Sequence, residues 1–289
     1  MKENLMIHYV LPDYDLPEEY RSIMESIDNI KIHPSRNKPF YGFSIEGESD
    51  VSVMTSVPQT ITSRNVVLRL SFDDAANQRE QIGRLFQQST RINICFTDVE
   101  HFDDSKIDAY KQMLEEWSQT IQEMFVRGRM PQFNLLTDRI MLSEMNNCNA
   151  GVSTITLAPN GKFYICPAFY YDEVKKVDNL LSYSDPSSDY SLGDVESGLS
   201  IPNRQLLSID KAPLCRRCDA FQCKRCIWLN HKLTMDNNTP SRQQCIMAHI
   251  ERNASMSLLD RIRKIDSTFM SNVTINGIDY LDPFEKIDN

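Results

Sequence analysis

Four cysteines lie within twelve residues of this chain. Residues 215–226 read CRRCDAFQCKRC, so two Cys-x2-Cys pairs are separated by four residues and are interleaved with four cations. Thiols this close together must be held by disulfides, by zinc or by an iron–sulfur cluster, and each choice restricts the local fold. The three alternatives also imply different compartments and different functions.

The distribution of cysteines disfavours disulfides. Cys95 is the only one of eight that precedes position 148. The N-terminal MKENLMIHYVLPDYD has a short apolar run, includes His8 and continues into acids, unlike a secretory signal, and no stretch has membrane-spanning length. We therefore expect a cytoplasmic protein with reduced thiols. The other seven cysteines fall within 98 residues: Cys148, Cys166, Cys215, Cys218, Cys223, Cys226 and Cys245.

Zinc and iron–sulfur remain as alternatives. Zinc sites with two Cys-x2-Cys pairs usually place a longer loop between the pairs than the four residues found here. Iron–sulfur motifs tolerate denser cysteine runs, and seven clustered cysteines exceed what one zinc needs. Thiolate clusters are anionic, and nearby cations favour the thiolate form. Four cations could offset that charge, unless they form an ordinary solvated surface: Arg216, Arg217, Lys224 and Arg225.

Composition narrows the function further. The 289 residues are 41% hydrophobic and 25% charged, which is typical of a globular chain with a sizeable core. The net charge of −9 argues against binding to nucleic acid or to an anionic membrane surface. Glycine is scarce, and neither GxGxxG nor GxxxxGK[ST] occurs, so nothing indicates a dinucleotide or nucleoside triphosphate site.

The first half alternates strand-like and helix-like segments. This order predicts βα units and a mostly parallel sheet, either a partial βα barrel or an open sheet. The expected strands are 5–11, 50–56, 66–72, 91–96 and 133–136, and the expected helices are 17–27, 73–89 and the long helix after 103–105. The apolar face of the long helix comprises Ile107, Tyr110, Met113, Leu114, Trp117, Ile121 and Met124.

The second half is organised around a predicted hairpin. Asn160-Gly161 lies between two β-prone runs, 153–157 and 162–165. Cys148 then precedes the hairpin, and Cys166 ends its second strand. Residues 172–205 are rich in Ser, Asp and Asn and are predicted to form a long loop or insertion. A helix is expected near 245–260, and VTINGIDYL at 273–281 suggests another Asn-Gly hairpin.

The cysteine order, together with Gly161, resembles the SPASM domain of radical SAM peptide maturases. The match covers about 148–252, and the hairpin PNGKFYICPAF looks like its first element. The gaps before Cys223 and before Cys226 are each a residue shorter than the usual pattern. The resemblance implies one or two [4Fe-4S] clusters. Carried over by position, Cys148, Cys166 and Cys226 would hold one cluster, and Cys215, Cys218, Cys223 and Cys245 the other.

The first half lacks the cysteines of a radical SAM enzyme. Such enzymes use CxxxCxxC to bind the cluster that cleaves S-adenosylmethionine, but the first 147 residues contain one cysteine. The chain is similar to the CXXX repeat peptide maturase family, especially over CKRCIWLNHKLTMDNNTPSRQQC and the ERNAS that follows. That resemblance implies an accessory maturase without autonomous radical chemistry. Its partners would be a radical SAM peptide maturase and a Cys-repeat precursor peptide.

These interpretations divide the chain into three predicted parts. Residues 1–147 would form a radical-SAM-like partial barrel without its cluster, 148–252 a SPASM-like metal-binding domain, and 253–289 a C-terminal extension. The alternative function is a zinc-stabilised interaction or nucleic-acid-binding module without catalysis, with the CRRC and CKRC patch as its contact surface.

Several other polar residues are predicted to be structural. Asp98, Glu100, His101, Asp103 and Asp104 follow a strand, where sites often sit, but helix capping in a solvated loop is the simpler expectation. Cys95 is expected in the core, since free cysteine buries readily. His231 and His249 lie near the cysteines and are interpreted as ordinary structural histidines.

Overall fold

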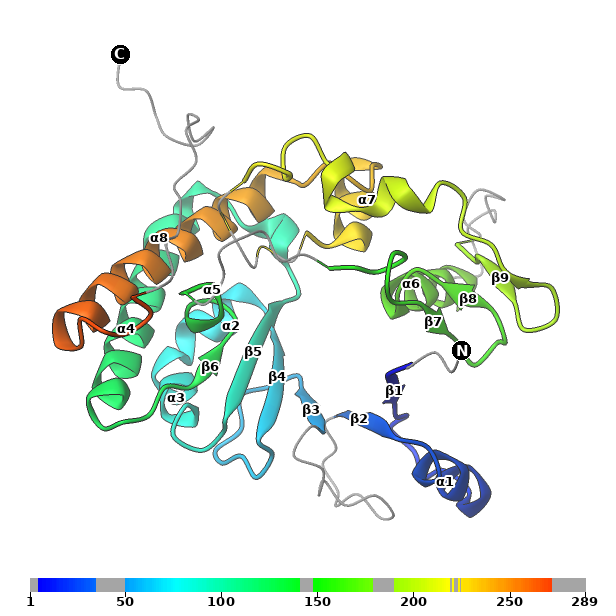
Figure 1. The fold of residues 1–289 in the computed structure, drawn as a ribbon, viewed down its shortest axis with the longest axis horizontal. Helices are drawn as coiled ribbons and strands as arrows, with labels where there is room; N and C mark the ends of the chain where they lie inside the picture. The colour runs from blue at the N-terminus through cyan, green and yellow to red at the C-terminus, as the bar shows by residue number, and fades with distance from the viewer. Residues whose placement is uncertain are drawn as a thin grey trace. The chain divides into compact units, whose positions relative to one another are not determined.

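A computed structural model describes residues 5–34, 50–140, 148–178, 190–218, 220, 223 and 225–271. The chain divides into two compact units. The first, called the sheet unit, comprises Met1–Met141 and His249–Val273. The second, called the cysteine unit, comprises Leu142–Ala248 and Thr274–Asn289. Figure 1 shows the elements of both.

The sheet unit is built on six parallel strands whose spatial order follows the chain. Sequential order is that of a singly wound βα barrel, whereas doubly wound sheets reverse their order. The α/β class and the parallel sheet predicted from sequence are thus confirmed. The strands are β1 (Ile7–Val10), β2 (Asn29–Pro34), β3 (Val51–Met54), β4 (Asn65–Leu70), β5 (Arg91–Phe96) and β6 (Gln132–Phe133).

The predicted elements of this unit are largely found, with some differences. The strand expected over 133–136 is instead β6 at residues 132–133, followed by a turn and by a helix at 137–140 that was not expected. Strand β2 has no counterpart among the expectations, because NIKIHP lacks clean alternation and ends in proline. The single helix expected over 73–89 is two helices, which meet at Gln78 with φ −110°. The helices and turns are α1 (Glu18–Glu25), α2 (Phe72–Asn77), α3 (Arg79–Leu85), η1 (Val99–His101), η2 (Asp104–Lys106), α4 (Ile107–Val126) and α5 (Thr137–Ile140).

One face of the sheet is buried against helices. Alternate residues of β4 and β5 point into this core, where Val66, Leu68 and Ile92 are at most 1% exposed. The predicted apolar stripe of α4 packs there as well, with Trp117 edge-on to Phe133. Every predicted stripe residue is buried except Ile107, which is half-buried at the first turn.

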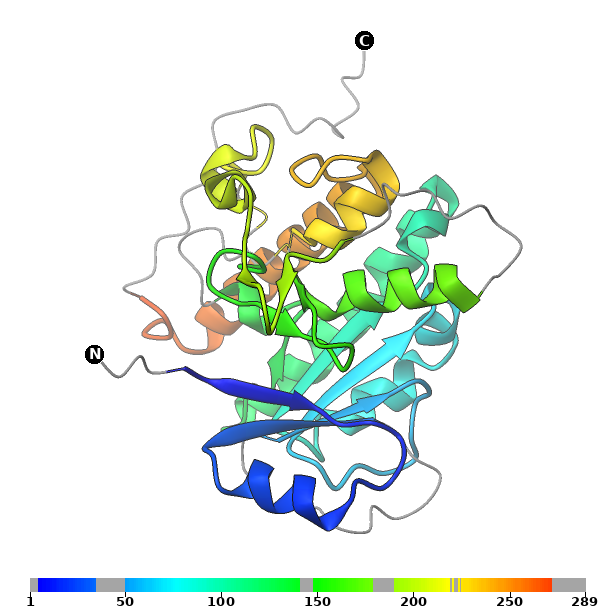
Figure 2. The same cartoon turned by 90° about the vertical axis from the view of Figure 1, so that its right-hand side faces the viewer.

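A long helix, α8 (Arg242–Ile265), completes the core of the sheet unit with its residues from His249 onward. Figures 1 and 2 show this part of α8 beside α4. Glu251 accepts a hydrogen bond from the Tyr110 hydroxyl and pairs with Arg139. All three side chains are at most 8% exposed. The predicted helix over 245–260 is confirmed and is longer at both ends.

The cysteine unit contains the predicted hairpin. Strands β7 (Thr156–Leu157) and β8 (Phe163–Tyr164) pair antiparallel, and Ala158 N–H donates to the Lys162 carbonyl at 3.0 Å. The loop is therefore Pro159-Asn160-Gly161, with Gly161 at φ +76°, the left-handed position such three-residue loops require. Asn160 Oδ1 accepts from the Lys162 N–H at 3.1 Å and closes the turn.

The region predicted as a long loop contains regular structure, so that prediction is wrong in part. Residues 172–178 continue α6 (Pro167–Asp178), and a second hairpin pairs β9 (Gly193–Asp194) with β10 (Gly198–Leu199). Helix α7 (Ile227–Thr234) and the turns η4 (Arg204–Leu207) and η5 (Ile209–Lys211) complete the unit. Residues 179–189 and the expected hairpin at 273–281 lie outside the described residues. Over the described ranges, none of the helices could span a bilayer.

Candidate metal centre

The hairpin brings Cys148 and Cys166 together. Burial raises the pKa of the Cys166 thiol, and the neighbouring Cys148 raises it further, whereas the N–H groups of Ala168 and Phe169 lower it. Cys166 directly precedes α6, whose first N–H groups are unpaired within the helix and carry its positive dipole end. The Cys166 sulfur thus faces donors that would favour a thiolate.

Cys226 occupies the same kind of position on another helix. It is the N-cap of α7, and its sulfur accepts a hydrogen bond from the Leu229 N–H at 3.4 Å. Cys166 packs against a small apolar cluster that includes Ile227, the residue after Cys226. Two members of the first implied ligand set, Cys166 and Cys226, therefore begin helices that share one small core.

The first half of CRRCDAFQCKRC forms a tight turn. The Cys218 N–H donates to the Cys215 carbonyl at 3.0 Å, and the Cys218 sulfur accepts from the Ala220 N–H at 3.4 Å. Burial raises the pKa of Cys215 to about 11, with Arg225 opposing that rise and Cys218 adding to it. Cys215 and Cys218 are thus a second pair of neighbouring thiols.

The four cations of the motif differ in exposure. Arg216 and Arg217 are exposed, as the solvated-surface alternative expects, and Lys224 lies outside the described residues. Arg225 is 0% exposed. Burial lowers its pKa, while the thiols of Cys215, Cys148 and Cys223 raise it. The sequence pattern presented four equivalent cations, and the structure distinguishes one of them.

Cys223 and Cys245 belong to neither of these pairs. Cys223 is half-buried, and its N–H donates to the Ala220 carbonyl at 3.1 Å. Cys245 is in the first turn of α8, with its N–H bonded to the Ser241 carbonyl at 3.2 Å. None of the eight cysteines forms a disulfide.

The thiols come together as pairs and not as a ligand shell. Within the described ranges, no three His, Cys, Asp or Glu side chains are arranged so that they could hold a metal ion. The donor chemistry nevertheless fits a thiolate-bound metal: sulfurs at two helix N-termini, two pairs of adjacent thiols and a buried cation among them. Metal ligands are often gathered only when the metal binds, because folding and binding are coupled.

The polar residues interpreted as structural behave largely as expected. Asp98 Oδ1 accepts from the Phe72 N–H at 2.9 Å, and Asp103 caps η2 by accepting from the Ser105 N–H at 2.9 Å. The Ser105 hydroxyl also donates to Asp103 and is the main cause that lowers the pKa of Asp103. His231 packs against the rings of Phe169 and Tyr190.

The expectation for Cys95 is wrong, because its side chain is exposed. Strand β5 alternates, so that Ile92 and Ile94 enter the core while Cys95 lies on the opposite face of the sheet. Arg69, its register partner on β4, is also exposed.

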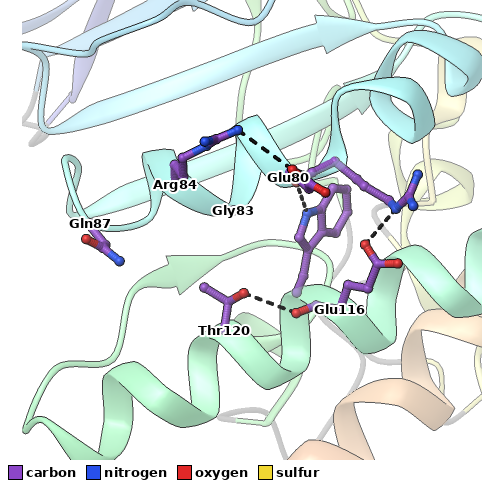
Figure 3. A pocket seen from close by; sticks show the side chains of 8 residues that line it. Glu80, Gly83, Arg84, Gln87, Glu116 and Thr120 are labelled. Carbon is purple, nitrogen blue, oxygen red and sulfur yellow. Dashed lines mark hydrogen bonds and ion pairs between the residues drawn. The ribbon is translucent and has the colours of Figure 1, made fainter.

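A hollow of about 320 Å³ lies between α3 and α4, and no cysteine lines it (Figure 3). Its charged side chains bind one another: Arg79 Nε lies 2.6 Å from Glu116 Oε2, and Arg84 lies 3.8 Å from Glu80. The Trp117 indole N–H donates to the Arg79 carbonyl at 2.9 Å. Since these groups satisfy each other, the hollow offers a ligand little to recognise.

Comparison with known proteins adds no assignment. No family model matches the chain, and no curated protein matches it.

Proposed function

We propose that the chain is an accessory maturase whose cysteine unit binds one or two [4Fe-4S] clusters in a reduced, cytoplasmic setting. It would assist a separate radical SAM enzyme acting on a Cys-repeat precursor peptide. The seven ligands would be those of the two implied sets: Cys148, Cys166 and Cys226, and Cys215, Cys218, Cys223 and Cys245. The SPASM-like spacing supports the module, and the lack of CxxxCxxC supports the accessory role.

One observation carries the metal-binding part of this proposal. The guanidinium of Arg225 is fully buried, which lowers its pKa, while the thiols of Cys215, Cys148 and Cys223 raise that pKa, and it forms no ion pair with a carboxylate of the described residues. Burying an unpaired charge costs several kcal/mol, so buried cations are normally accompanied by anions. Neutral thiols do not meet this need, whereas metal-bound thiolates do.

The chain's own residues would perform the binding and shielding. The N–H groups at the starts of α6 and α7 would orient the Cys166 and Cys226 sulfurs, and those of Ala168 and Phe169 oppose the rise that burial causes in the pKa of Cys166. The cluster Tyr164, Phe169 and Ile227 excludes water from the same region, since each is at most 3% exposed. Bound clusters supply electron storage and, at an iron with only three protein ligands, an open position. A cysteine of the precursor would suit that position.

Metal analysis tests the proposal directly. The protein is produced with an iron–sulfur assembly system, purified anaerobically, and assayed for iron, sulfide and zinc. We expect iron and sulfide in near-equal amounts and a brown colour. Stoichiometric zinc in a colourless protein would instead support the zinc-stabilised interaction module. Neither metal at stoichiometric level would rule out both.

A second measurement tests the link to peptide maturation. EPR spectra of the reduced holoprotein are recorded with a Cys-repeat peptide and with the same peptide carrying Ser in place of each Cys. We expect only the thiol peptide to change the spectrum, because only it can ligate the open iron. Identical spectra with both peptides would refute thiol ligation.

A further inference from the structure

Strand β1 forms one edge of the six-stranded sheet, and among the residues that the structure describes it pairs only with β2. The Leu11 N–H donates to the Ile32 carbonyl at 3.0 Å, so alternate residues along β1 direct their backbone groups toward β2. His8 and Val10 lie between those residues and direct their N–H and carbonyl groups outward. The outer side of β1 therefore presents donors and acceptors that a further strand could use.

This edge lacks the features that usually protect a sheet from further pairing. Proteins commonly place lysine, proline or a bulge on an edge strand. The sequence of β1 is IHYV, which contains neither lysine nor proline, and its register with β2 is regular over all four residues. The side chains of His8 and Val10 are exposed as well. The edge is thus open to another polypeptide.

Helix α1 adds an apolar surface beside this edge. None of its residues is buried, and the half-buried Arg21 and Met24 mark the side that packs on the strands. Tyr20, Ile23 and Ile27 recur at helical spacing on an adjacent side and are 58%, 59% and 40% exposed. Because crossovers between parallel strands are right-handed, this apolar stripe lies on the side of α1 nearer the outer edge of β1. Exposed apolar patches of this kind mark interaction surfaces.

The charge of the region limits what could bind there. Residues 5–34 contain six acidic and two basic side chains, so they carry a net charge of −4 out of −9 for the whole chain. One of the two bases, Arg21, is paired with Glu18 at 3.0 Å. A second copy of the chain would bring the same negative charge to the edge, and nucleic acid or an anionic membrane would also be repelled. A polypeptide with positive charge is favoured instead.

We propose that the outer edge of β1 and the apolar stripe of α1 bind an extended segment of a partner polypeptide in which apolar and basic residues alternate. The segment would pair with His8 and Val10 as a seventh strand of the sheet. Since side chains of a strand alternate between its two faces, the apolar ones would contact the stripe of α1. The basic ones would lie on the opposite face, in the negative field of the region.

The test uses the full-length protein and short fluorescein-labelled peptides, with binding followed by fluorescence anisotropy. The probe peptide alternates Val and Lys, and a second peptide has Glu in place of each Lys. Two further probes are the Val–Lys peptide N-methylated at every Val or at every Lys. Only one of these two sets of N–H groups can face β1 in a paired strand, because N–H groups alternate in direction along a strand.

Two pairs of protein variants locate the site. Val10→Pro removes the outward N–H and leaves the bonds to β2 intact, whereas Val10→Thr keeps that N–H and is the matched control. Ile23→Lys places a charge on the apolar stripe. Its control, Ser22→Lys, adds the same charge at an exposed position of α1 outside the stripe.

We expect the Val–Lys peptide to bind and the Val–Glu peptide not to bind. N-methylation of one set of residues should abolish binding, and N-methylation of the other should be tolerated. Val10→Pro should weaken binding about tenfold relative to Val10→Thr, because a hydrogen bond to the peptide is lost and the ring obstructs the edge. Ile23→Lys should weaken it more than Ser22→Lys does.

Several results would overturn the proposal: no binding of the Val–Lys peptide, equal binding of the Val–Glu peptide, or equal effects of the two N-methylations. Equal affinities within either pair of variants would do the same. Sedimentation of the protein alone provides a further arm, since a dimer that Val10→Pro dissociates would assign the edge to a second copy of the chain. If Val10→Pro does not fold, the comparison of Ile23→Lys with Ser22→Lys and the N-methylated peptides decide.

The site uses residues of the sheet unit and no cysteine. Its test is therefore independent of the metal content of the protein, and the metal-binding function proposed above can fail without affecting the outcome.

Discussion

The two units of the chain bury different kinds of side chain. The sheet unit has an extensive apolar core, in which large residues such as Trp117, Phe86 and Phe133 contact one another across strands and helices. The cysteine unit has a buried cluster of five residues, Ala158, Tyr164, Phe169, Leu207 and Ile227, and beside it a buried cation. Among the described residues of this unit the apolar cluster is small, and cores of that size are often supplemented by cross-links such as disulfides or a bound metal. We therefore expect the cysteine unit to depend on its thiols more than the sheet unit does.

Metal removal should produce the largest difference in stability between the two units. Structural metal sites in small domains contribute about 10 kcal/mol or more to folding. We expect a chelator, or the double change Cys218→Ala with Cys223→Ala, to expose residues 148–248 to limited proteolysis while the sheet unit stays protected. Cys95→Ala is the control and should change neither unit, because Cys95 is exposed on a strand. Equal protection with and without metal would contradict a structural role for the thiols.

Breaking the buried ion pair of the sheet unit should have the next largest effect. Glu251→Gln leaves Arg139 buried without a carboxylate, and such losses cost about 3–5 kcal/mol. Urea unfolding followed by Trp117 fluorescence in a Trp228→Phe background would measure it. Glu115→Gln is the matched control, because Glu115 is half-exposed and its pair with Arg261 should contribute below about 1 kcal/mol. Similar losses in both variants would argue against a special role for burial.

Replacing one glycine in each unit by alanine should change the stability of the two units in opposite directions. Gly161→Ala places a Cβ at φ +76°, which should destabilise the hairpin of the cysteine unit by about 1 kcal/mol. Gly83→Ala should stabilise the sheet unit by about 0.5–1 kcal/mol, since Gly83 is helical and its Cβ would meet Thr120 at an ordinary 3.7 Å. Trp228 and Trp117 report the two unfolding transitions. If both variants change the free energy of unfolding in the same direction, this interpretation of the two backbone conformations is contradicted.

A dependence of stability on pH is expected in the sheet unit from His33. Burial is the main cause that lowers the pKa of His33 below its usual 6.5, although Asp50 lies 3.6 Å away. The unfolded chain therefore takes up a proton before the folded one does. Stability should be full above pH 6.5 and should fall, by at most about 1.4 kcal/mol per pH unit, as the pH drops toward the folded pKa. His33→Gln should flatten this dependence between pH 7.5 and 5.5, and an unchanged slope would contradict it.

Prediction from the sequence succeeded where periodicity was long. The helix α4 repeats its apolar residues over five turns, and β5 is a clean run, so both were located from pattern alone. Strand β2 and helices α6 and α7 are short and interrupted by polar residues, and their form depends on tertiary packing. The prediction of a loop over 172–205 failed in part for the same reason, because strands of two residues such as β9 and β10 give no periodic signal in the sequence.

For the candidate site, spacing located the hairpin and its Gly161 but not the differences among the cations. Arg216, Arg217 and Arg225 are equivalent in sequence, and only the fold buries one of them. The hydrogen bond that Arg225 Nη1 donates to Asn238 Oδ1 likewise gave no signal in the sequence, because it joins residues thirteen positions apart. Cys95 shows the reverse error: cysteine is usually buried, but the face of the sheet to which a strand residue points decides its exposure.

The exposure of Cys95 also provides an internal standard for counting reactive thiols. It is separated in sequence from the seven proposed ligands, and its sulfur is open to reagents. A maleimide dye added to intact holoprotein should react once per chain, at Cys95, and should react eight times after the metal is stripped under denaturing conditions. The difference between the two readings gives the number of thiols that are shielded by ligation or by burial, independently of any spectroscopic model of the centre.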